Sequence, residues 1–525
     1  MPKTAKRGAS ARSPRQQQPS TNGVAKAPKG ARIEKDTMGE MPVPADALYG
    51  ASTQRAVLNF PVSGRPVPFG IIAAYAEIKG ACATVNQKLK RLDKGRADAI
   101  RHACGVIAGG MEDFGAGGWA KHFPIDVFQT GSGTSTNMNA NEVIANLICL
   151  SRGAPIGSSK NADYLKAGGV HPNDHVNMGQ SSNDTFPTSI HVAAALAIAD
   201  ELLPALGRMF KRLESQAEQW DKVVKIGRTH LQDATPIRLG QEFSGFASQV
   251  AHAETRAMQA LYALLELPIG GTAVGTGINA HEEFDAMVCE ELAESTGLEF
   301  RPCENHFEAQ HAKDACVEAS GLLKTIATSL TKIAADIRLM GMGPRCGIGE
   351  LIIPAVQPGS SIMPGKVNPV ICESLIMVCG KVIGNDASVT YGNLGGLNST
   401  LDLNVAMPLI AECLLESIQL LARGCDMFTT NLLEGLKPDE KRCKELIEGS
   451  LAMCTSLVPV IGYDASATLA KDAFKQGKTV RQLALETVVG QPDRSTGKPL
   501  TADALDAYLN PWSMTLPGGE GSAGG

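Results

Sequence analysis

The sequence predicts a mainly α-helical protein built around a long central helical bundle. Aromatic residues make up only 5% of the chain while Ala, Leu and Ile are abundant, which favours helices over a β-sandwich. Apolar residues in the centre of the chain also recur at helical spacing. The length of 525 residues is too great for one small core and suggests two to four domains.

Residues 1–31 differ from the rest of the chain. They contain seven Lys or Arg, no Asp or Glu, and several prolines. Such a segment buries too little apolar surface to offset its ordering entropy, so we interpret it as a disordered basic tail. Its lack of acids resembles an organelle transit peptide, but its prolines and few large apolar residues argue against a targeting helix. Residues 517–525 are predicted to form a second, Gly-rich tail.

Four segments are predicted to supply long helices. Ile190–Met209 and Glu242–Leu265 are the first two, with Pro187 near the start of the first and Pro204 as its kink. The third carries a stripe at spacings of four, four, three and four: Leu322, Ile326, Leu330, Ile333 and Ile337. The fourth carries Leu414, Ile418 and Leu421. Helices with such stripes must pack on one another, which predicts a bundle.

Composition excludes several classes of function. A net charge of −5 gives no reason to expect a nucleic-acid or membrane partner, and charged residues interrupt every apolar stretch, so no membrane span is expected. No Rossmann or P-loop glycine pattern occurs in its required context. The thirteen cysteines are scattered and form no CxxC pair, which predicts no zinc site and a reducing compartment. We therefore expect the cytoplasm, or an organelle matrix if the basic tail is a transit peptide.

The most informative segment is the loop Gly359–Pro369, with the sequence GSSIMPGKVNP. Pro364 and Pro369 exclude a helix interior. The loop offers free backbone N–H groups, two hydroxyls and a lysine, which together suit a bound carboxylate. If only its first three residues, Gly-Ser-Ser, are considered, an ordinary surface loop is the alternative interpretation.

Several motifs in one order resemble the fumarase/aspartase superfamily. The loop 359–369 resembles its signature, and residues 32–40 resemble the start of a class II fumarase. The other matching motifs are GSGT at 131–134, HPND at 171–174, SSND at 181–184 and GRTHLQD at 227–233. The resemblance extends from about Arg32 into the C-terminal region.

The resemblance implies a fold and an activity. The expected fold is the three-domain fumarase/aspartase-like fold, with an N-terminal domain at 32–180, the central bundle at 181–435 and a small helical domain at 436–516. The expected activity is reversible, stereospecific hydration of fumarate to L-malate, with a small dicarboxylate substrate and neither cofactor nor metal. The family also implies a homotetramer whose active sites are shared between chains.

The chemistry requires a base at carbon, donors around the substrate carboxylate, and a group that handles the hydroxyl. By resemblance, Ser360 is the base, His230 acts through a water, and Glu373 orients His230. A solvent-exposed helix residue is the alternative for Glu373. The resemblance assigns substrate binding to Ser132, Thr134, Ser181, Ser182, Asn183, Thr229, Lys366 and Asn368.

A second, peripheral carboxylate site is implied at His171, Asn173 and Asp174. Gly168 stands where an arginine is common, which predicts a weaker or absent site. His171 and His175 are four apart, but Pro172 disfavours the helix that a metal pair would need. His306 and His311 have no partner motif and are interpreted as structural.

Two other functions remain open. Aspartate ammonia-lyase shares the loop, although Ser181-Ser182-Asn183 and Met363-Pro364-Gly365-Lys366 favour fumarase. A non-catalytic structural relative is the second alternative, and the presence of Ser360, Lys366 and His230 argues against it.

Overall fold

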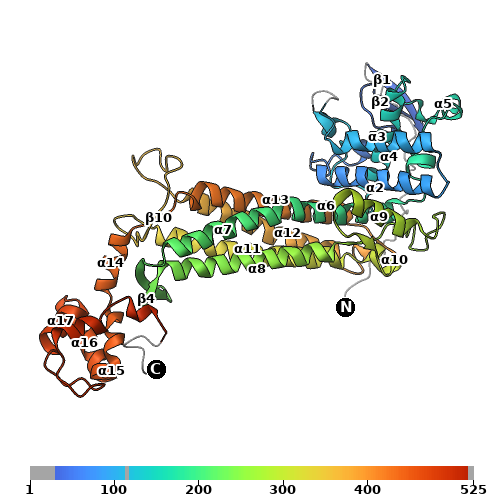
Figure 1. Cartoon of the computed structure of the whole chain (residues 1–525). Coiled ribbons are helices and arrows are strands. Elements are labelled where there is room, and N and C mark those ends of the chain that lie inside the picture. The colour runs from blue at the N-terminus through green and yellow to red at the C-terminus, as the bar shows by residue number, and fades with distance from the viewer. Residues whose placement is uncertain (1–29, 113–116, 518–525) are drawn as a thin grey trace, which may run out of the picture.

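The computed structural model describes residues 30–112 and 117–517. The basic tail lies outside these residues up to position 29, as does the Gly-rich tail from position 518. Ala31, the last residue of the predicted tail, lies in a strand opposite Pro44. The molecule is elongated, with a central bundle, the N-terminal region at one end and the C-terminal helices at the other (Figure 1).

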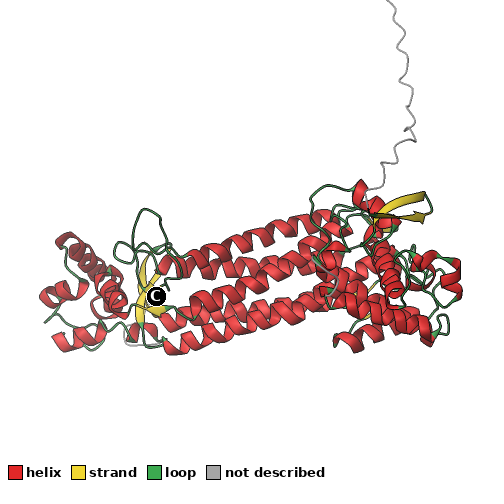
Figure 2. Ribbon diagram, turned by 90° about the horizontal axis from the view of Figure 1, so that it is seen from above, coloured by secondary structure: helices red, strands yellow, loops and turns green. Residues whose placement is uncertain are grey.

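Long helices that run side by side form the bundle (Figure 2). They are α6 (Ser182–Ala197), α7 (Leu203–Gln219), α8 (Leu239–Ala263), α11 (Asp314–Met340), α12 (Val370–Gly392) and α13 (Met407–Phe428). Around the bundle, α7 packs on α8, α8 on α11, α11 on α12, α12 on α13, and α13 on α7. The prediction of a mainly α fold with a long central bundle is confirmed.

The apolar stripes predicted for the bundle form its core. Ile326, Leu330, Ile333 and Ile337 of α11 are all fully buried. Leu322 is only partly buried, because the adjacent Leu323 occupies the core position instead. The predicted kink at Pro204 corresponds to a π-helical turn, Ile198–Leu202, that joins α6 to α7. Pro204 itself is the second residue of α7, directly after this turn, where it removes one backbone N–H donor from the continuous helix.

The expectation that no segment could span a membrane is wrong on length and composition. Residues Ser182–Gln219 are helical over 38 consecutive positions. The most apolar 18-residue window of this segment has a mean hydropathy of 1.5, and 61% of that window is buried. These residues pack against α8 and α13. The segment is therefore one of the packed helical rods of the bundle.

Smaller elements lie at the two ends of the bundle. The N-terminal region contains β1 (Ala31–Asp36), β2 (Gly39–Pro44), α1 (Ala51–Asn59), α2 (Phe69–Lys88), α3 (Lys94–Ala108), α4 (Thr134–Ser151) and α5 (Ala162–Lys166). The same end of the bundle carries β5 (Glu266–Leu267), α9 (Phe284–Thr296), β6 (Arg301–Pro302), α10 (His306–His311), β8 (Ser399–Thr400) and β9 (Leu403–Asn404).

The opposite end carries the C-terminal helices and two antiparallel strand pairs, β3 with β4 and β7 with β10. The strands are β3 (Val224–Thr229), β4 (Gln232–Arg238), β7 (Leu351–Ile352) and β10 (Lys437–Pro438). The helices are α14 (Glu440–Gly449), α15 (Val458–Ile461), α16 (Tyr463–Gln476), α17 (Val480–Thr487) and α18 (Ala502–Tyr508).

Two apolar cores hold these parts together. One runs without interruption through the N-terminal region and the bundle. The other is formed by the C-terminal helices and includes Ile226 of β3. The hairpin β3–β4 therefore lies at the junction between the bundle and the C-terminal helices.

Candidate active site

Three hydroxyl side chains are hydrogen-bonded in a row where α4 and α6 begin. The hydroxyl oxygens of Ser132 and Thr134 are 2.9 Å apart, and that of Thr134 is 2.7 Å from Ser182 Oγ. Gly133 between them has a φ of 71°. A Cβ atom there would lie 1.9 Å from the Phe186 ring, so only glycine fits. Two helix N-termini meet at these hydroxyls, and their free N–H groups favour a bound anion.

The start of α6 also holds the loop 270–277. Asn183 Nδ2 donates a hydrogen bond of 2.8 Å to the carbonyl of Ala273 in this loop. The Asp184 carboxyl accepts hydrogen bonds from two further backbone N–H groups of the loop, at 3.2 and 2.9 Å. It also accepts one from the backbone N–H of Ser181 at 2.9 Å. Burial raises the pKa of Asp184 to about 7. Ser181 and Asn183 are thereby fixed beside this loop.

A buried lysine near these residues was missed by the sequence reasoning. Lys79 of α2 is fully buried and donates hydrogen bonds to Asn137 Oδ1 and Gln180 Oε1 at 2.9 and 3.0 Å. Burial lowers the pKa of Lys79 to about 8. The available signal was a lysine within the largely apolar stretch Ile71–Ala83 of this helix.

His230 occupies the tip of the hairpin β3–β4, at the far end of the bundle. His230 and Leu231 have φ angles of 55° and 59°, and Thr229 pairs with Gln232 across the turn. Two positive φ angles are typical of the tight turn whose twist matches a β-hairpin. The turn leaves Thr229 and His230 exposed to solvent.

A buried ionic network lies under this hairpin. Lys225 Nζ is 3.0 Å from Glu242 Oε2 and 3.4 Å from Glu350 Oε2. Arg228 Nη1 donates to both carboxylate oxygens of Glu350 at 2.9 Å. Glu350 is completely buried. Because both strand residues contact one buried carboxylate, the hairpin is fixed to the segment that precedes β7.

The loop 359–369 is closed by hydrogen bonds at its base. The Gly359 N–H donates to the Lys366 carbonyl at 2.9 Å, and Asn368 Nδ2 donates to the Gly359 carbonyl at 2.8 Å. Ser360 Oγ accepts hydrogen bonds from the backbone N–H groups of Ile362 and Met363, at 3.3 and 3.1 Å. The serine oxygen therefore already has two donors that would stabilise negative charge on it.

Lys366 and Glu373 follow Ser360 in the chain, and both side chains are exposed. Lys366 is exposed and, within residues 30–112 and 117–517, forms no ion pair. Lys366 and Asn368 line a cavity of about 850 Å³ that also contacts Arg338 and Asp439. Glu373 lies exposed in the first turn of α12, and no hydrogen bond or ion pair joins it to His230 in the described part of the chain.

One chain thus places the candidate residues in two groups at opposite ends of the bundle. The first group lies where α6 begins and consists of Ser132, Thr134 and residues 181–183. The second group lies at the other end of the bundle and consists of residues 229–230 and the loop 359–369 (Figure 1). The helical rod between the two groups has 38 residues, which corresponds to roughly 57 Å at the α-helical rise. A single chain cannot close both groups around one small substrate.

The residues predicted to form the peripheral carboxylate site, His171, Asn173 and Asp174, lie together in a local turn. His171 Nδ1 accepts hydrogen bonds from the backbone N–H groups of Asn173 and Asp174 at 3.3 and 3.1 Å. Burial lowers the pKa of His171 and of His175, which favours their neutral forms. Asn173 and Asp174 are exposed. The Gly168 carbonyl accepts a hydrogen bond from Arg152.

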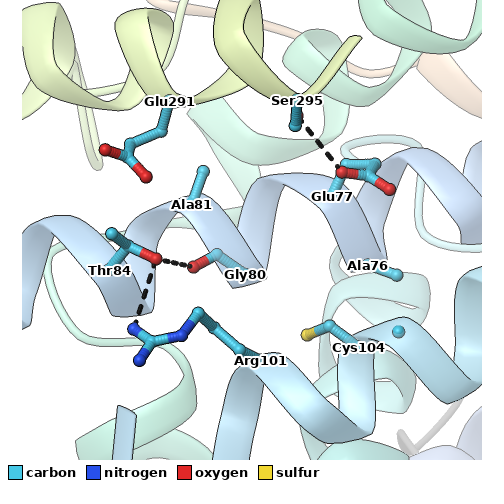
Figure 3. Close-up of a pocket in the computed structure, with 10 residues that line it drawn as sticks. Ala76, Glu77, Gly80, Ala81, Thr84, Arg101, Cys104, Glu291 and Ser295 are labelled. Atoms are coloured by element: carbon cyan, nitrogen blue, oxygen red, sulfur yellow. Dashed lines mark hydrogen bonds between the residues drawn. The ribbon is translucent and has the colours of Figure 1, made fainter. Parts of the chain in front are cut away.

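Neither a metal site nor a second substrate pocket between α2, α3 and α9 receives support from the described residues. No group of three or more His, Cys, Asp or Glu side chains among them is arranged to hold a metal ion. A cavity of about 280 Å³ between α2, α3 and α9 contains none of the candidate residues (Figure 3). Its Arg101 is already bound to Thr84 and Gln87, and Glu77 and Glu291 disfavour a carboxylate ligand.

Comparison with known proteins gives consistent matches along the chain. The lyase family profile matches residues 39–384, and that of the fumarase C C-terminus matches residues 453–516. "Fumarate hydratase class II" of Corynebacterium glutamicum is 50% identical over 486 residues, which is 92% of this chain and 96% of that protein. "Fumarate hydratase 1, mitochondrial" of Arabidopsis thaliana is 47% identical and covers 93% of this chain and 93% of that protein.

A solved structure agrees with these sequence matches. The recombinant class II fumarase from Schistosoma mansoni superposes with a TM-score of 0.84 at 37% identity. The match covers 93% of this chain and 100% of that one. The similarity therefore includes the N-terminal region, the bundle and the C-terminal helices together.

Proposed function

Because this chain belongs to the lyase family, and within it to the class II fumarases, we propose that it is a fumarate hydratase that interconverts fumarate and L-malate. The observation that best supports this function is the environment of Ser360. Its oxygen accepts two backbone hydrogen bonds within a loop that also carries the exposed Lys366.

The proton step requires a strong base at a weak carbon acid. Malate must lose a proton from the carbon next to a carboxylate that is already negative. Ser360 acts as the base in its oxyanion form, which the N–H groups of Ile362 and Met363 and the charge of Lys366 stabilise. The ammonium of Lys366 and the amide of Asn368 hold the substrate carboxylate while charge develops on it.

The hydroxyl is handled on the opposite side of the substrate. His230 activates the water or protonates the departing hydroxyl, with Glu373 as its orienting carboxylate. The hydroxyl side chains at the two helix N-termini, together with Asn183 and Thr229, bind the other end of the dicarboxylate. The row of hydrogen bonds from Ser132 to Ser182 supports this role, because its members already hold one another in place.

The active site is assembled from several chains of a homotetramer. The separation of the candidate groups along one rod supports this proposal, since both groups are needed at one substrate. Bundles from neighbouring chains that pack side by side would bring the start of α6 of one chain to the hairpin and loop of others.

The domain limits at 32–180, 181–435 and 436–516 belong to the same proposal.

The proposal includes two further assignments, a peripheral carboxylate site and a cellular compartment. A peripheral carboxylate site at His171, Asn173 and Asp174 is weak, because position 168 has no side chain to pair with an anion. The cytoplasm is the compartment that the thirteen unpaired cysteines favour. An organelle matrix is the alternative, since the Arabidopsis relative is named mitochondrial.

One assay tests the proposed reaction. Purified full-length protein is given L-malate, and the absorbance of the fumarate formed is followed, with L-aspartate in a parallel sample. We expect turnover of L-malate without added metal or nucleotide. Faster turnover of L-aspartate would identify an ammonia-lyase instead, and no turnover of either would identify a non-catalytic relative.

A further inference from the structure

Three side chains near the start of α10 form a line that resembles a nucleophilic triad. Cys303 Sγ lies 3.2 Å from His306 Nδ1. The other ring nitrogen, His306 Nε2, lies 3.1 Å from Asp285 Oδ2 on α9. No sequence motif indicated this partner of His306, because α9 brings Asp285 to it from 21 residues away.

The middle member of this line carries a positive charge at neutral pH. The hydrogen bonds to Asp285 and Cys303 raise the pKa of His306 to about 10. The hydrogen bond from His306 lowers the pKa of Asp285, so its carboxyl is ionised. A protonated imidazole 3.2 Å from a sulfur provides the electropositive surroundings in which reactive cysteines occur.

Two other titratable groups, Cys289 and Lys313, lie near Cys303, and neither competes with it for an oxidant. Burial raises the pKa of Cys289, the neighbouring thiol on α9, which therefore stays protonated. Burial lowers the pKa of Lys313 to about 8. Cys303 is half-buried, whereas Cys289 is 1% exposed.

We propose that Cys303 is a redox-sensitive thiol that is oxidised to a sulfenic acid by small, uncharged hydroperoxides such as hydrogen peroxide. The thiolate sulfur attacks one peroxide oxygen, and the S–O bond forms as the O–O bond breaks. The departing hydroxide takes the proton of the His306 imidazolium and leaves as water. The sulfur loses two electrons, the peroxide gains them, and His306 becomes neutral.

The charge around Cys303 selects an uncharged oxidant over an anionic electrophile. Asp285 lies on α9, Glu308 lies on α10, and Glu304 directly follows Cys303 in the chain. The cavity of about 520 Å³ that reaches Pro302, next to Cys303 in the chain, is also mainly acidic, because Glu282, Glu283 and Glu290 line it with Arg301. Carboxylates at this density repel dicarboxylates and other anions. The substrate of the enzyme itself is therefore a poor reagent for this thiol.

The triad packs directly against the loop that the start of α6 holds. A Cβ atom on Gly270 would lie 2.6 Å from Asp285 Cβ, and one on Gly271 would lie 3.2 Å from His306 Cβ. The loop 270–277 in turn is bound to Asn183 and Asp184. An added oxygen on Cys303, next to His306, therefore disturbs the support of this loop. Oxidation is expected to lower the rate of the enzyme.

The test compares two cysteines of the same protein. Full-length enzyme at pH 7 is treated with hydrogen peroxide in the presence of dimedone, and labelled peptides are quantified by mass spectrometry. We expect Cys303 to be labelled at least about tenfold faster than the exposed Cys346, because only Cys303 faces an imidazolium. Equal rates at the two positions would overturn the proposal.

Two controls separate the chemistry from simple exposure. His306→Gln, which keeps a polar side chain without the charge, should reduce labelling of Cys303 to the rate of Cys346. Wild-type protein should also react faster with neutral iodoacetamide than with anionic iodoacetate at Cys303, relative to Cys346. The second comparison needs no variant, so misfolding of His306→Gln leaves the proposal testable. Absence of this preference would refute the argument from charge.

An activity measurement tests the link to the loop. Peroxide should lower the initial rate of malate dehydration, and dithiothreitol should restore it. Cys303→Ser should have the untreated rate and keep it in peroxide. Complete oxidation of Cys303 with an unchanged rate would show that the thiol is not coupled to the loop 270–277.

Discussion

Ser360 shows how a weakly basic side chain is prepared for proton abstraction. Two backbone N–H groups already donate to its oxygen, and the closed base of the loop holds them there. This preparation costs little at the moment of reaction, because the donors do not have to reorganise.

Replacement of Ser360 by Ala is expected to lower kcat by roughly 10²–10⁴-fold with a small change in KM. A base acts in the transition state, whereas Lys366 and Asn368 keep their contacts with the bound substrate. Steady-state kinetics with L-malate test this expectation, with Ser361→Ala as the control on the neighbouring hydroxyl. Near-normal turnover of Ser360→Ala would assign the base to another residue.

His306 gives the folded protein a pH-dependent contribution to stability. Its pKa rises from 6.5 to about 10 on folding, so the contribution is fully present below pH 6.5 and is lost as the pH rises through 10. The side chain is 21% exposed, and solvent screening limits the contribution to about 1–2 kcal/mol.

His306→Gln should therefore be less stable than wild type at pH 6, and the difference should shrink as the pH approaches 10. Chemical denaturation at pH 6, 8 and 10 measures it. Cys303→Ser, which keeps the His306–Asp285 pair, serves as the control and should retain most of the pH dependence. A deficit of constant size across this range would contradict the assigned charge on His306.

At the scale of elements, the sequence was informative wherever periodicity alone determines structure. The stripe from Leu322 to Ile337 predicted α11, and Pro204 marked the junction of α6 and α7. The sequence did not reveal that α9 would bring Asp285 to His306, or that Glu350 would lie beneath the hairpin, because these contacts depend on tertiary packing. Motif resemblance selected the candidate site residues but could not show that one chain separates them.

The hairpin β3–β4 depends on its buried carboxylate. Glu350→Ala would leave Lys225 and Arg228 as charges with reduced compensation in the protein interior, and we expect a loss of about 3–5 kcal/mol. Glu445→Ala removes an exposed partner of Arg442 and should cost less than about 1 kcal/mol. Denaturation curves of the two variants test this difference, and equal losses would show that the network does not anchor the hairpin.

At the scale of the whole molecule, the length of the bundle determines how a site can form. The rod between the start of α6 and the hairpin is roughly 57 Å long, whereas a four-carbon dicarboxylate spans only a few ångströms. Residues at both ends can serve one substrate only if separate chains lie beside one another. Function is then tied to assembly, because a free monomer holds only part of the site.

Mixed assembly tests whether sites are shared. His230→Asn and Ser360→Ala are unfolded and refolded together in equal amounts, and each is also refolded alone. If His230 and Ser360 reach one site from different chains, random mixing leaves about a quarter of the sites with both native residues. Activity should therefore return toward about a quarter of the wild-type value, although neither variant alone is active. If both residues came from the same chain, every site would lack one of them. Mixed tetramers demonstrated by native mass spectrometry that stay inactive would therefore exclude a site shared in this way.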